Sequence, residues 1–405
     1  MDEFKFRILR SDYHIVSITE SWATANVTDA ELSIAGYSMI RKDRSSDKNS
    51  KGGGVILYVK DSLVHTPVES LNEHSFGESA WCHVELSTGK LLVGVCYRST
   101  ASDQQNNNQL LQLLNEATKI ADKSHLLIMG DFNFPEIDYN GYEVHALCGS
   151  DATNFFDMTQ DLFLSQHVHD HTRFRQGQNP SLLDYIFTYE ENQIDNLIHQ
   201  APVAKSDHAC LSFDYVAKAN ECTFSGCKFD YHKGDYTSII AELQCIEWEK
   251  VLHSKGCEET WRILRDIITA LIEKHIPVRS GSANKSRHRD SWIQRRTVKE
   301  IKRREAAWRR YKTFSSERNY TEYKKVRNKV TAMIRQDHQT YQRKLVQSFK
   351  QNQKKFYAYV RTKQSVKTKV CRILKSDGSR TSSDKETADV LGEQFQSVFF
   401  SRNGN

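Results

Sequence analysis

The sequence predicts an α/β fold in which two β-sheets pack as a sandwich flanked by helices, followed by a basic helical region. Three observations predict it. Short apolar runs rich in β-branched and aromatic residues recur from residue 10 to about residue 217, as in buried strands. Amphipathic stretches lie between them. The charge then changes sign, because residues 1–280 carry 25 Lys/Arg against 40 Asp/Glu and residues 281–370 carry 27 against 6.

The predicted strands come first in the chain. In order they are HIVSI, GVILYV, WCHVEL, LLVGVCY, HLLIMGDF, LLDYIFT and HACLSFDY. Residues 109–121 and 151–164 carry apolar side chains at helical spacing and are predicted helices. Strands and helices mixed at this spacing are typical of an α/β sandwich, which we place at residues 1–217.

The rest of the chain is predicted to be helical. Residues 218–280 form a helical connector, in which Pro277 follows two segments with apolar residues three and four apart. Residues 281–370 form a basic helical linker, with an amphipathic helix from residue 292 to about residue 362 that is broken near Phe314. Residues 371–405 form the last predicted segment.

The basic linker has more than one interpretation. Its apolar stripe is explained by packing against a core, and its charges by a solvated helical face. The same Lys and Arg side chains would neutralise nucleic-acid phosphates, and packing on one face does not exclude phosphate binding on the other. An acidic body beside a basic block also suggests divalent cations next to a phosphate-binding segment.

Composition excludes several classes of protein. No apolar stretch approaches the roughly 18 residues that a membrane span requires, and the N-terminus lacks a hydrophobic run of signal-peptide length. The nine cysteines are scattered without a C-x-x-C pair, which favours reduced thiols over disulfides or a zinc site. We therefore expect an intracellular protein, nuclear or cytoplasmic, that is not secreted and does not contact membranes.

Polar signatures at the ends of predicted strands are the candidates for chemistry. Glu20 in ITESW follows an apolar strand, where a carboxylate can bind Mg²⁺ but is also ordinary at a surface. Tyr97 in CYRS could donate to a phosphate or pack as a buried aromatic. Asp131 and Asn133 in GDFN follow a third strand, and their side chains project to the same side if the backbone stays extended. Such a pair can orient a water and stabilise an oxyanion.

Two further signatures complete the set. Asp184 in LLDYIF is a carboxylate in a buried strand, so it is expected to have a partner. Asp207 and His208 in SDH enter the last strand. A histidine beside a metal-capable aspartate, with another carboxylate to fix its tautomer, fits phosphodiester hydrolysis.

These five motifs occur in the order found in the endonuclease/exonuclease/phosphatase superfamily, which the chain resembles. KGGGVILY at residues 51–58, residues 166–183 with Thr172-Arg173, and KKFYAYV at residues 354–360 also resemble the endonuclease and linker of LINE-type, non-LTR, jockey-like retrotransposon proteins. Residues 371–405 resemble the start of their reverse transcriptase, without a polymerase palm. The resemblance implies an exonuclease III-like sandwich and an endonuclease that nicks target DNA, dependent on Mg²⁺ or Mn²⁺.

The resemblance also implies a role for each motif residue. Glu20 would bind the metal, with help from Asp207. Asp131 would position or activate the attacking water, while Asn133 and Tyr97 would contact the phosphate.

The remaining two motif residues, Asp184 and His208, would act together at the scissile phosphate. His208, held by Asp184, would stabilise the charge of the scissile phosphate. The implied partners are DNA as target and element RNA bound through residues 281–370. The superfamily also contains enzymes that act on RNA, lipids and small phosphoesters, so the motifs define chemistry better than substrate.

One departure from the family's pattern affects the expected activity. Family members begin with a strand that ends in an asparagine, and here Met1 falls in what looks like the helix after that strand. The first strand is therefore expected to be missing, which predicts a weakened or inactive nuclease or a gene model truncated at its start. The alternatives are an inactive nucleic-acid-binding remnant of such an element and a host-adopted phosphoesterase.

Overall fold

The fold is described from a computed structural model of the 405-residue chain. The structure describes residues 2–44, 52–121, 125–219, 229–277, 292–364 and 384–400, together with positions 373, 375 and 381. The junction between the predicted connector and the predicted basic linker, residues 278–291, lies outside these ranges, as do Cys222, Cys227 and Cys371. The six described cysteines are free thiols. No described helix is both long enough and apolar enough to cross a membrane.

The larger sheet has six strands in the order β10-β11-β7-β6-β5-β4. Its strands are β4 (His65–Pro67), β5 (Ser79–Leu86), β6 (Gly89–Tyr97), β7 (Leu126–Asp131), β10 (Ser165–Gln166) and β11 (Asp184–Thr188). β6 and β7 are parallel, and the other pairs are antiparallel. Strand β6 is almost continuously buried because both faces of the sheet are covered.

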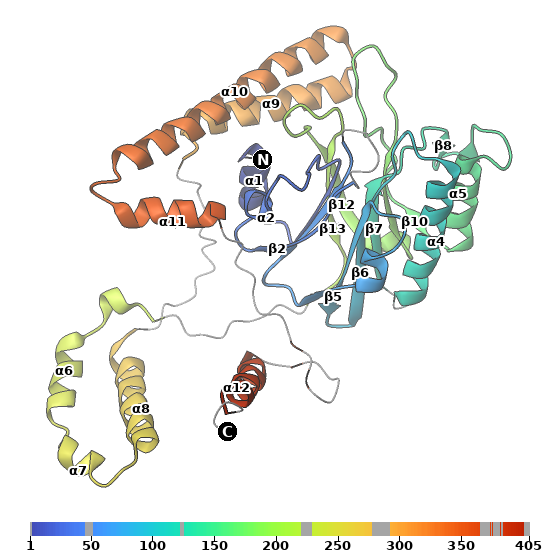
Figure 1. Ribbon diagram of the computed structural model, residues 1–405. Helices are drawn as coiled ribbons and strands as arrows, with labels where there is room; N and C mark the ends of the chain where they lie inside the picture. Colours follow the sequence, from blue (N-terminus) through green and yellow to red (C-terminus); the bar gives the residue numbers. More distant parts are fainter. Residues whose placement is uncertain are drawn as a thin grey trace.

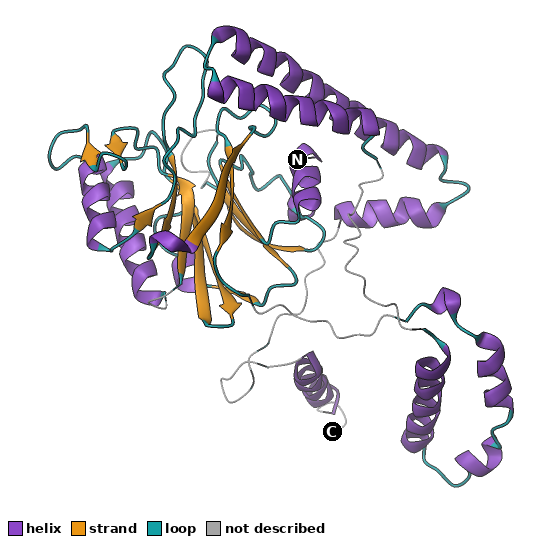
Figure 2. Cartoon of the chain, turned by 180° about the vertical axis from the view of Figure 1, so that it is seen from behind, coloured by secondary structure: helices purple, strands orange, loops and turns teal. Residues whose placement is uncertain are grey.

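The second layer contains two smaller sheets. One has the order β1-β3-β2, with β1 (Ile15–Thr19), β2 (Tyr37–Lys42) and β3 (Val55–Lys60), and the other pairs β12 (Ile194–Gln200) with β13 (Cys210–Tyr215). Apolar side chains from both layers fill the space between them. Leu57 of β3 shares one core with Val95 of β6 and Met129 of β7. The predicted two-sheet sandwich is confirmed (Figures 1 and 2).

Helices cover the outer faces of the sandwich. On one side lie α4 (Gln104–Ile120) and α5 (Asp151–Asp161), each begun by a side-chain cap, Asp103 and Ser150 respectively. On the other side, α1 (Asp2–Ser11) and α2 (Asp29–Leu32) contribute Ile8 and Leu32 to a core with Tyr58. Short elements complete this part: α3 (Glu69–Asn72), β8 (Ile137–Asp138), β9 (Glu143–Val144) and η1 (Glu191–Gln193).

A helical hairpin from the basic region packs directly on the sandwich. It consists of α9 (Arg295–Thr313) and α10 (Glu317–Gln347), and the break predicted near Phe314 is where Ser316 caps α10. Trp308 and Tyr323 of the hairpin form one buried cluster with Phe174 and Ala209 of the sandwich. Figure 1 shows both helices running across the end of the sheets. The hairpin thus shares a hydrophobic core with the sandwich.

The other described segments are helical as well. They are η2 (Tyr231–Lys233), α6 (Tyr236–Gln244), α7 (Trp248–Leu252), α8 (Cys257–His275), α11 (Gln353–Gln364) and α12 (Asp384–Phe400). Helices α6 and α8 are joined by Glu242, whose carboxylate accepts from Lys274 at 2.7 Å and lies 2.8 Å from Nε2 of His275. The predicted boundaries between domains stay a prediction.

Candidate active site

Three of the predicted site residues form a row across the larger sheet. Tyr97 at the end of β6 is the register partner of Asp131 on β7, and Asp131 is the partner of Asp184 on β11. Side chains of paired residues project to the same face of a sheet. Two residues back on each strand, Val95 and Met129 face the core between the sheets. The row therefore lies at the rim of the sandwich, on the side that faces the second layer.

Gly130 permits the close strand approach behind this row. A Cβ atom at this position would lie 1.9 Å from the carbonyl oxygen of Cys96 on the neighbouring strand. No side chain fits there without a shift of the backbone. The glycine of the GDFN motif is thus explained by packing between β6 and β7, immediately before Asp131.

His208 joins the row from the loop between β12 and β13. Its Nδ1 lies 2.8 Å from Oδ2 of Asp184, and its Nε2 lies 4.0 Å from Oδ2 of Asp131. The expected partner of the strand carboxylate Asp184 is therefore His208. With Nδ1 held by Asp184, the other ring nitrogen is directed toward Asp131.

Thr172 fixes the two loops that carry this pair. Its hydroxyl accepts from the amide nitrogens of Leu183 and Asp184, both at 3.2 Å, and its carbonyl accepts from the amide nitrogen of Ala209 at 2.7 Å. Its side chain is fully buried. Sequence reasoning used Thr172 only as part of a resemblance, because a threonine in a polar stretch gives no sign of the segments it will connect.

Burial and neighbouring charges shift the pKa values of Asp131 and His208. Burial, followed by the negative charge of Asp184, raises the pKa of Asp131 well above its ordinary range, although His208 acts in the other direction. Burial would lower the pKa of His208, but the charge and hydrogen bond of Asp184 outweigh burial and raise it to about 9. His208 is therefore an imidazolium at neutral pH, beside a carboxylate that accepts a proton readily.

The backbone after β7 is not extended, so the condition under which Asp131 and Asn133 would project to the same side is not met. Asn133 has a φ of 51° and lies in the left-handed region, which asparagine tolerates better than most residues. Its amide nitrogen donates to Oδ1 of Asp131 at 3.2 Å. Its side-chain Nδ2 donates to the carbonyl of Arg98 at 2.7 Å, and Arg98 returns a bond to the Asn133 carbonyl at 2.9 Å. The turn is locked against the strand that carries Tyr97.

Glu20 and Tyr97 form a second pair. The Tyr97 hydroxyl donates to Oε1 of Glu20 at 2.5 Å, and the Trp22 indole donates to Oε2 at 3.3 Å. Burial, then the contact with Glu20, raises the pKa of Tyr97, so the phenol keeps its proton. The segment after Glu20 is fixed by the glycine loop, since the amide nitrogen of Ser21 donates to the Gly54 carbonyl at 3.0 Å.

Carboxylates are concentrated at this rim, and they could hold a divalent cation. Among the described residues, Asp131, Asp184 and His208 offer ligand atoms that all lie within 4.8 Å of one another. His208 cannot act as a ligand while it carries both protons, so the two carboxylates supply this capacity. The charges of Asp184 and Glu20 both raise the pKa of Asp131, and a cation would relieve this excess of negative charge. Oxygen donors of this kind suit Mg²⁺ and Mn²⁺.

The two residues predicted to bind metal lie apart from that cluster of ligand atoms. Glu20 is exposed and pairs with Tyr97. The Asp207 carboxylate instead pairs with Arg173, whose Nε lies 3.2 Å from Oδ2. The structure thus brings together Tyr97 and Glu20 at one side of the row, and Asp131, Asp184 and His208 at the other.

The family comparison matches this part of the chain. Residues 91–212 match the family model described as endonuclease-reverse transcriptase. The matched segment is similar to that family and makes up less than half of the chain. It contains six of the seven predicted site residues, all except Glu20. The resemblance predicted from the five motifs is therefore confirmed.

Three solved structures are similar to about half of this chain. The endonuclease domain of TRAS1, a telomere-specific non-LTR retrotransposon, is 12% identical, with 54% of this chain and 92% of that chain covered and a TM-score of 0.43. The 3′ phosphatase NExo from Neisseria is 15% identical, with 52% and 92% covered and a TM-score of 0.37. An AP endonuclease from Archaeoglobus fulgidus is 13% identical, with 53% and 93% covered and a TM-score of 0.37. Curated proteins gave no match.

Proposed function

We propose that the site is that of a metal-dependent endonuclease that hydrolyses phosphodiester bonds and nicks DNA, derived from a LINE-type retrotransposon. The observation that carries the proposal is the aligned row of Tyr97, Asp131 and Asp184. His208 is bonded to the Asp184 end of this row. The proposal is supported by a carboxylate that can accept a proton and an imidazolium held beside it at one rim of the sandwich. Phosphodiester hydrolysis needs both, one for the attacking water and one for the phosphate charge.

Each residue then has a defined task. Asp131 orients the attacking water and accepts its proton, which its raised pKa favours. The His208 imidazolium donates from Nε2 to a phosphate oxygen, and Asp184 holds the ring in this orientation. Tyr97 keeps its proton but donates it to Glu20, so the phosphate contact expected for Tyr97 stays a prediction. Asn133 holds the turn after Asp131, and the phosphate contact expected for it stays a prediction.

A divalent ion, when bound, would supply positive charge beside the phosphate. We propose that Glu20 would hold it together with Asp131, whose pKa the charge of Glu20 raises, and the help expected of Asp207 stays a prediction because its carboxylate pairs with Arg173. The proposed domain division keeps residues 1–217 as the endonuclease, 218–280 as connector, 281–370 as basic linker and 371–405 as the start of a reverse-transcriptase region. The proposed partners are target DNA and element RNA at residues 281–370, in the nucleus or cytoplasm.

The direct test is nicking of supercoiled plasmid by the full chain. With Mg²⁺ or Mn²⁺ the purified protein is expected to convert supercoiled plasmid to the open circle, and excess EDTA is expected to abolish the conversion. Binding of a plasmid without nicking in either metal would instead support the inactive nucleic-acid-binding remnant. Release of inorganic phosphate from small phosphoesters, with plasmid left intact, would support a host-adopted phosphoesterase.

The pH dependence of nicking tests the assignment of His208. The folded pKa of His208, about 9, lies above its ordinary value of about 6.5. The ion pair with Asp184 is therefore fully present below pH 6.5 or so and is lost as pH rises through about 9. The nicking rate is expected to fall through the same range. Initial rates measured across the neutral and alkaline range would show it.

The matched variant for this profile is Asp184→Asn. Removing the carboxylate removes the main cause that raises the pKa of His208, and burial then lowers it. The alkaline fall in rate is expected to move to lower pH. An alkaline limb that stays in place in Asp184→Asn would show that a group other than His208 limits the rate.

A further inference from the structure

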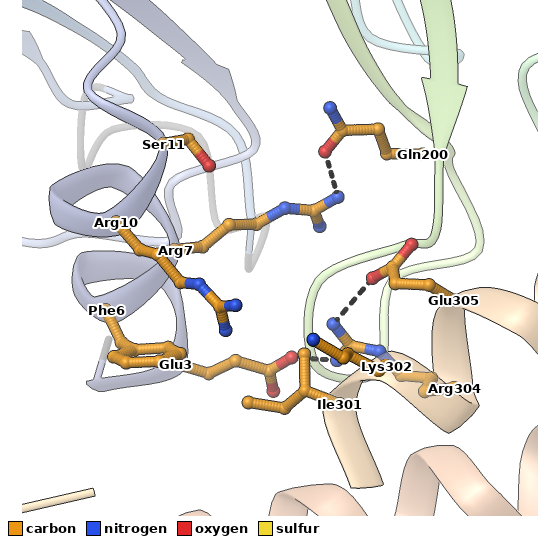
Figure 3. Close-up of a pocket in the computed structure, with 10 residues that line it drawn as sticks. All are labelled: Glu3, Phe6, Arg7, Arg10, Ser11, Gln200, Ile301, Lys302, Arg304 and Glu305. Carbon is orange, nitrogen blue, oxygen red and sulfur yellow. Dashed lines mark hydrogen bonds and ion pairs between the residues drawn. The ribbon is translucent and has the colours of Figure 1, made fainter. Parts of the chain in front are cut away.

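A cavity of about 250 Å³ lies where helix α1, the end of strand β12 and helix α9 meet. Figure 3 shows side chains reaching into it from all three elements. Its lining residues are Glu3, Phe6, Arg7, Arg10, Ser11, Gln200, Ile301, Lys302, Arg304 and Glu305. None of them belongs to the candidate active site. Four are cationic and two are anionic, so the lining carries an excess of positive charge.

The two carboxylates of the cavity are already paired with one arginine. Arg304 is 2% exposed and forms ion pairs with Glu3 and, at 3.1 Å, with Glu305. The other oxygen of Glu305 accepts from the amide nitrogen of Ala201 at 3.1 Å. These bonds join α1, α9 and the end of β12. The other three cations of the lining, Arg7, Arg10 and Lys302, do not form ion pairs with these two carboxylates in the described part of the chain.

Arg7 is held by neutral acceptors. Its guanidinium donates to the carbonyl of Ala201 at 2.7 Å and to Oε1 of Gln200 at 2.6 Å. These bonds orient the side chain without neutralising its charge. Within the described part of the chain, neither Arg10 nor Lys302 has a carboxylate at ion-pair distance. Figure 3 shows Arg10 and Lys302 directed toward the same space from opposite helices.

We propose that this cavity binds a backbone phosphate of a nucleic acid, through Arg7, Arg10 and Lys302. Phosphate oxygens accept from several guanidinium and ammonium donors at once, and arginine matches their geometry in particular. The Ser11 hydroxyl adds a neutral donor at the rim. A phosphodiester carries a single negative charge, which the excess positive charge of the lining can balance.

The surface beyond the cavity favours a polymer over a free phosphate ion. Along α9, exposed cations recur at spacings of four, three and seven residues, which place them on one face of the helix. They are Arg295, Lys299, Lys302 and Arg309. A row of cations that continues from the cavity fits successive phosphates of one strand. The site therefore combines the first helix of the chain with the basic hairpin.

The proposal goes beyond the proposed hydrolysis, and its test measures binding alone. The full chain is titrated, in EDTA, against a fluorescein-labelled duplex DNA of about 20 bp and against a single-stranded RNA of about 20 nucleotides, with fluorescence anisotropy recorded at several salt concentrations. The variant is Arg10→Gln with Lys302→Gln. Both residues are exposed, so the fold is expected to persist, and thermal unfolding followed by circular dichroism checks this.

The expected result is a weaker and less salt-dependent complex. Loss of one phosphate contact lowers the slope of log K against log salt by about 1, which corresponds to roughly tenfold weaker binding at about 0.1 M salt. The probe that shows this loss identifies DNA or RNA as the source of the phosphate. The matched control is Lys119→Gln with Lys218→Gln, two exposed cations near the opposite end of the sheet from Tyr97.

The result that would overturn the proposal is also specific. If the double variant binds both probes as the control does, or if the wild-type chain binds neither probe, the cavity is not a phosphate site. Either result is independent of plasmid nicking. Conversely, a chain that binds through the cavity but never nicks plasmid would leave this proposal standing and contradict the endonuclease.

Discussion

Replacing Asp131 with asparagine is expected to reduce plasmid nicking by roughly 10²–10⁴-fold, the range over which a positioned acid or base contributes to catalysis. The substitution keeps the shape of the side chain and can keep the bond from the Asn133 amide. It removes the buried carboxylate whose high pKa suits it to accept a proton from water. Initial nicking rates of the two proteins in Mg²⁺ are the measurement.

His208→Ala is expected to reduce plasmid nicking by a similar factor, for a different reason. It removes the imidazolium and leaves Asp184 as an unpaired carboxylate at the rim. DNA binding in EDTA should change little in either variant, because the cavity with Arg7, Arg10 and Lys302 lies outside the candidate active site and would keep its phosphate contact. The matched control is Asp157→Asn, an exposed carboxylate on α5, which should nick plasmid at the wild-type rate. An unchanged rate in Asp131→Asn would rule out the proposed active site.

Trp308→Ala is expected to destabilise the protein by about 3–5 kcal/mol, as for a buried Trp replaced by Ala. Trp308 is 1% exposed, and its ring packs edge-on against Phe174 with centroids 5.0 Å apart. Phe174 in turn donates its amide to the carbonyl of Asp207 at 2.8 Å. Loss of the indole should therefore loosen the segment that carries His208, and lower nicking as well as stability. Thermal unfolding and nicking rates measure the two effects.

Two further variants separate packing from chemistry. Trp308→Phe should restore most stability and nicking, because the indole Nε1 is buried without a hydrogen-bond partner among the described residues. Trp261→Ala, on α8 and 59% exposed, should change neither property. If Trp308→Ala lowers stability but nicks plasmid at the wild-type rate at low temperature, the hairpin stabilises the sandwich without positioning the catalytic loop.

The strands and the order of the motifs could be predicted from the sequence because their signals are local. An apolar run in β7 predicts a buried strand, and Asp131 directly after Gly130 marks its polar end. The carboxylate of Asp184 in a buried strand also required a partner by itself. The family match over residues 91–212 agrees with these local patterns.

Local patterns failed where the backbone turned or where distant segments met. An alternating pattern predicts a strand but does not show that Asn133 adopts left-handed backbone angles. The contact that holds this turn comes from Arg98, which follows a different strand. Likewise, the aromatic stripe of the basic helices predicted that they pack on a core, but it did not predict which surface they pack against. Only the folded chain shows that Trp308 packs on Phe174.

By itself, the sequence determined which residues are candidates for chemistry and where most strands of the larger sheet lie, because residue type and spacing set both. The tertiary structure decided that Tyr97, Asp131 and Asp184 stand in one row, since strand order and register depend on pairing between segments far apart in the chain. It also raises the pKa of His208, because Asp184 comes next to the ring only in the fold. The basic hairpin became part of the same core for the same reason: its apolar stripe needed a surface that only the assembled sandwich provides.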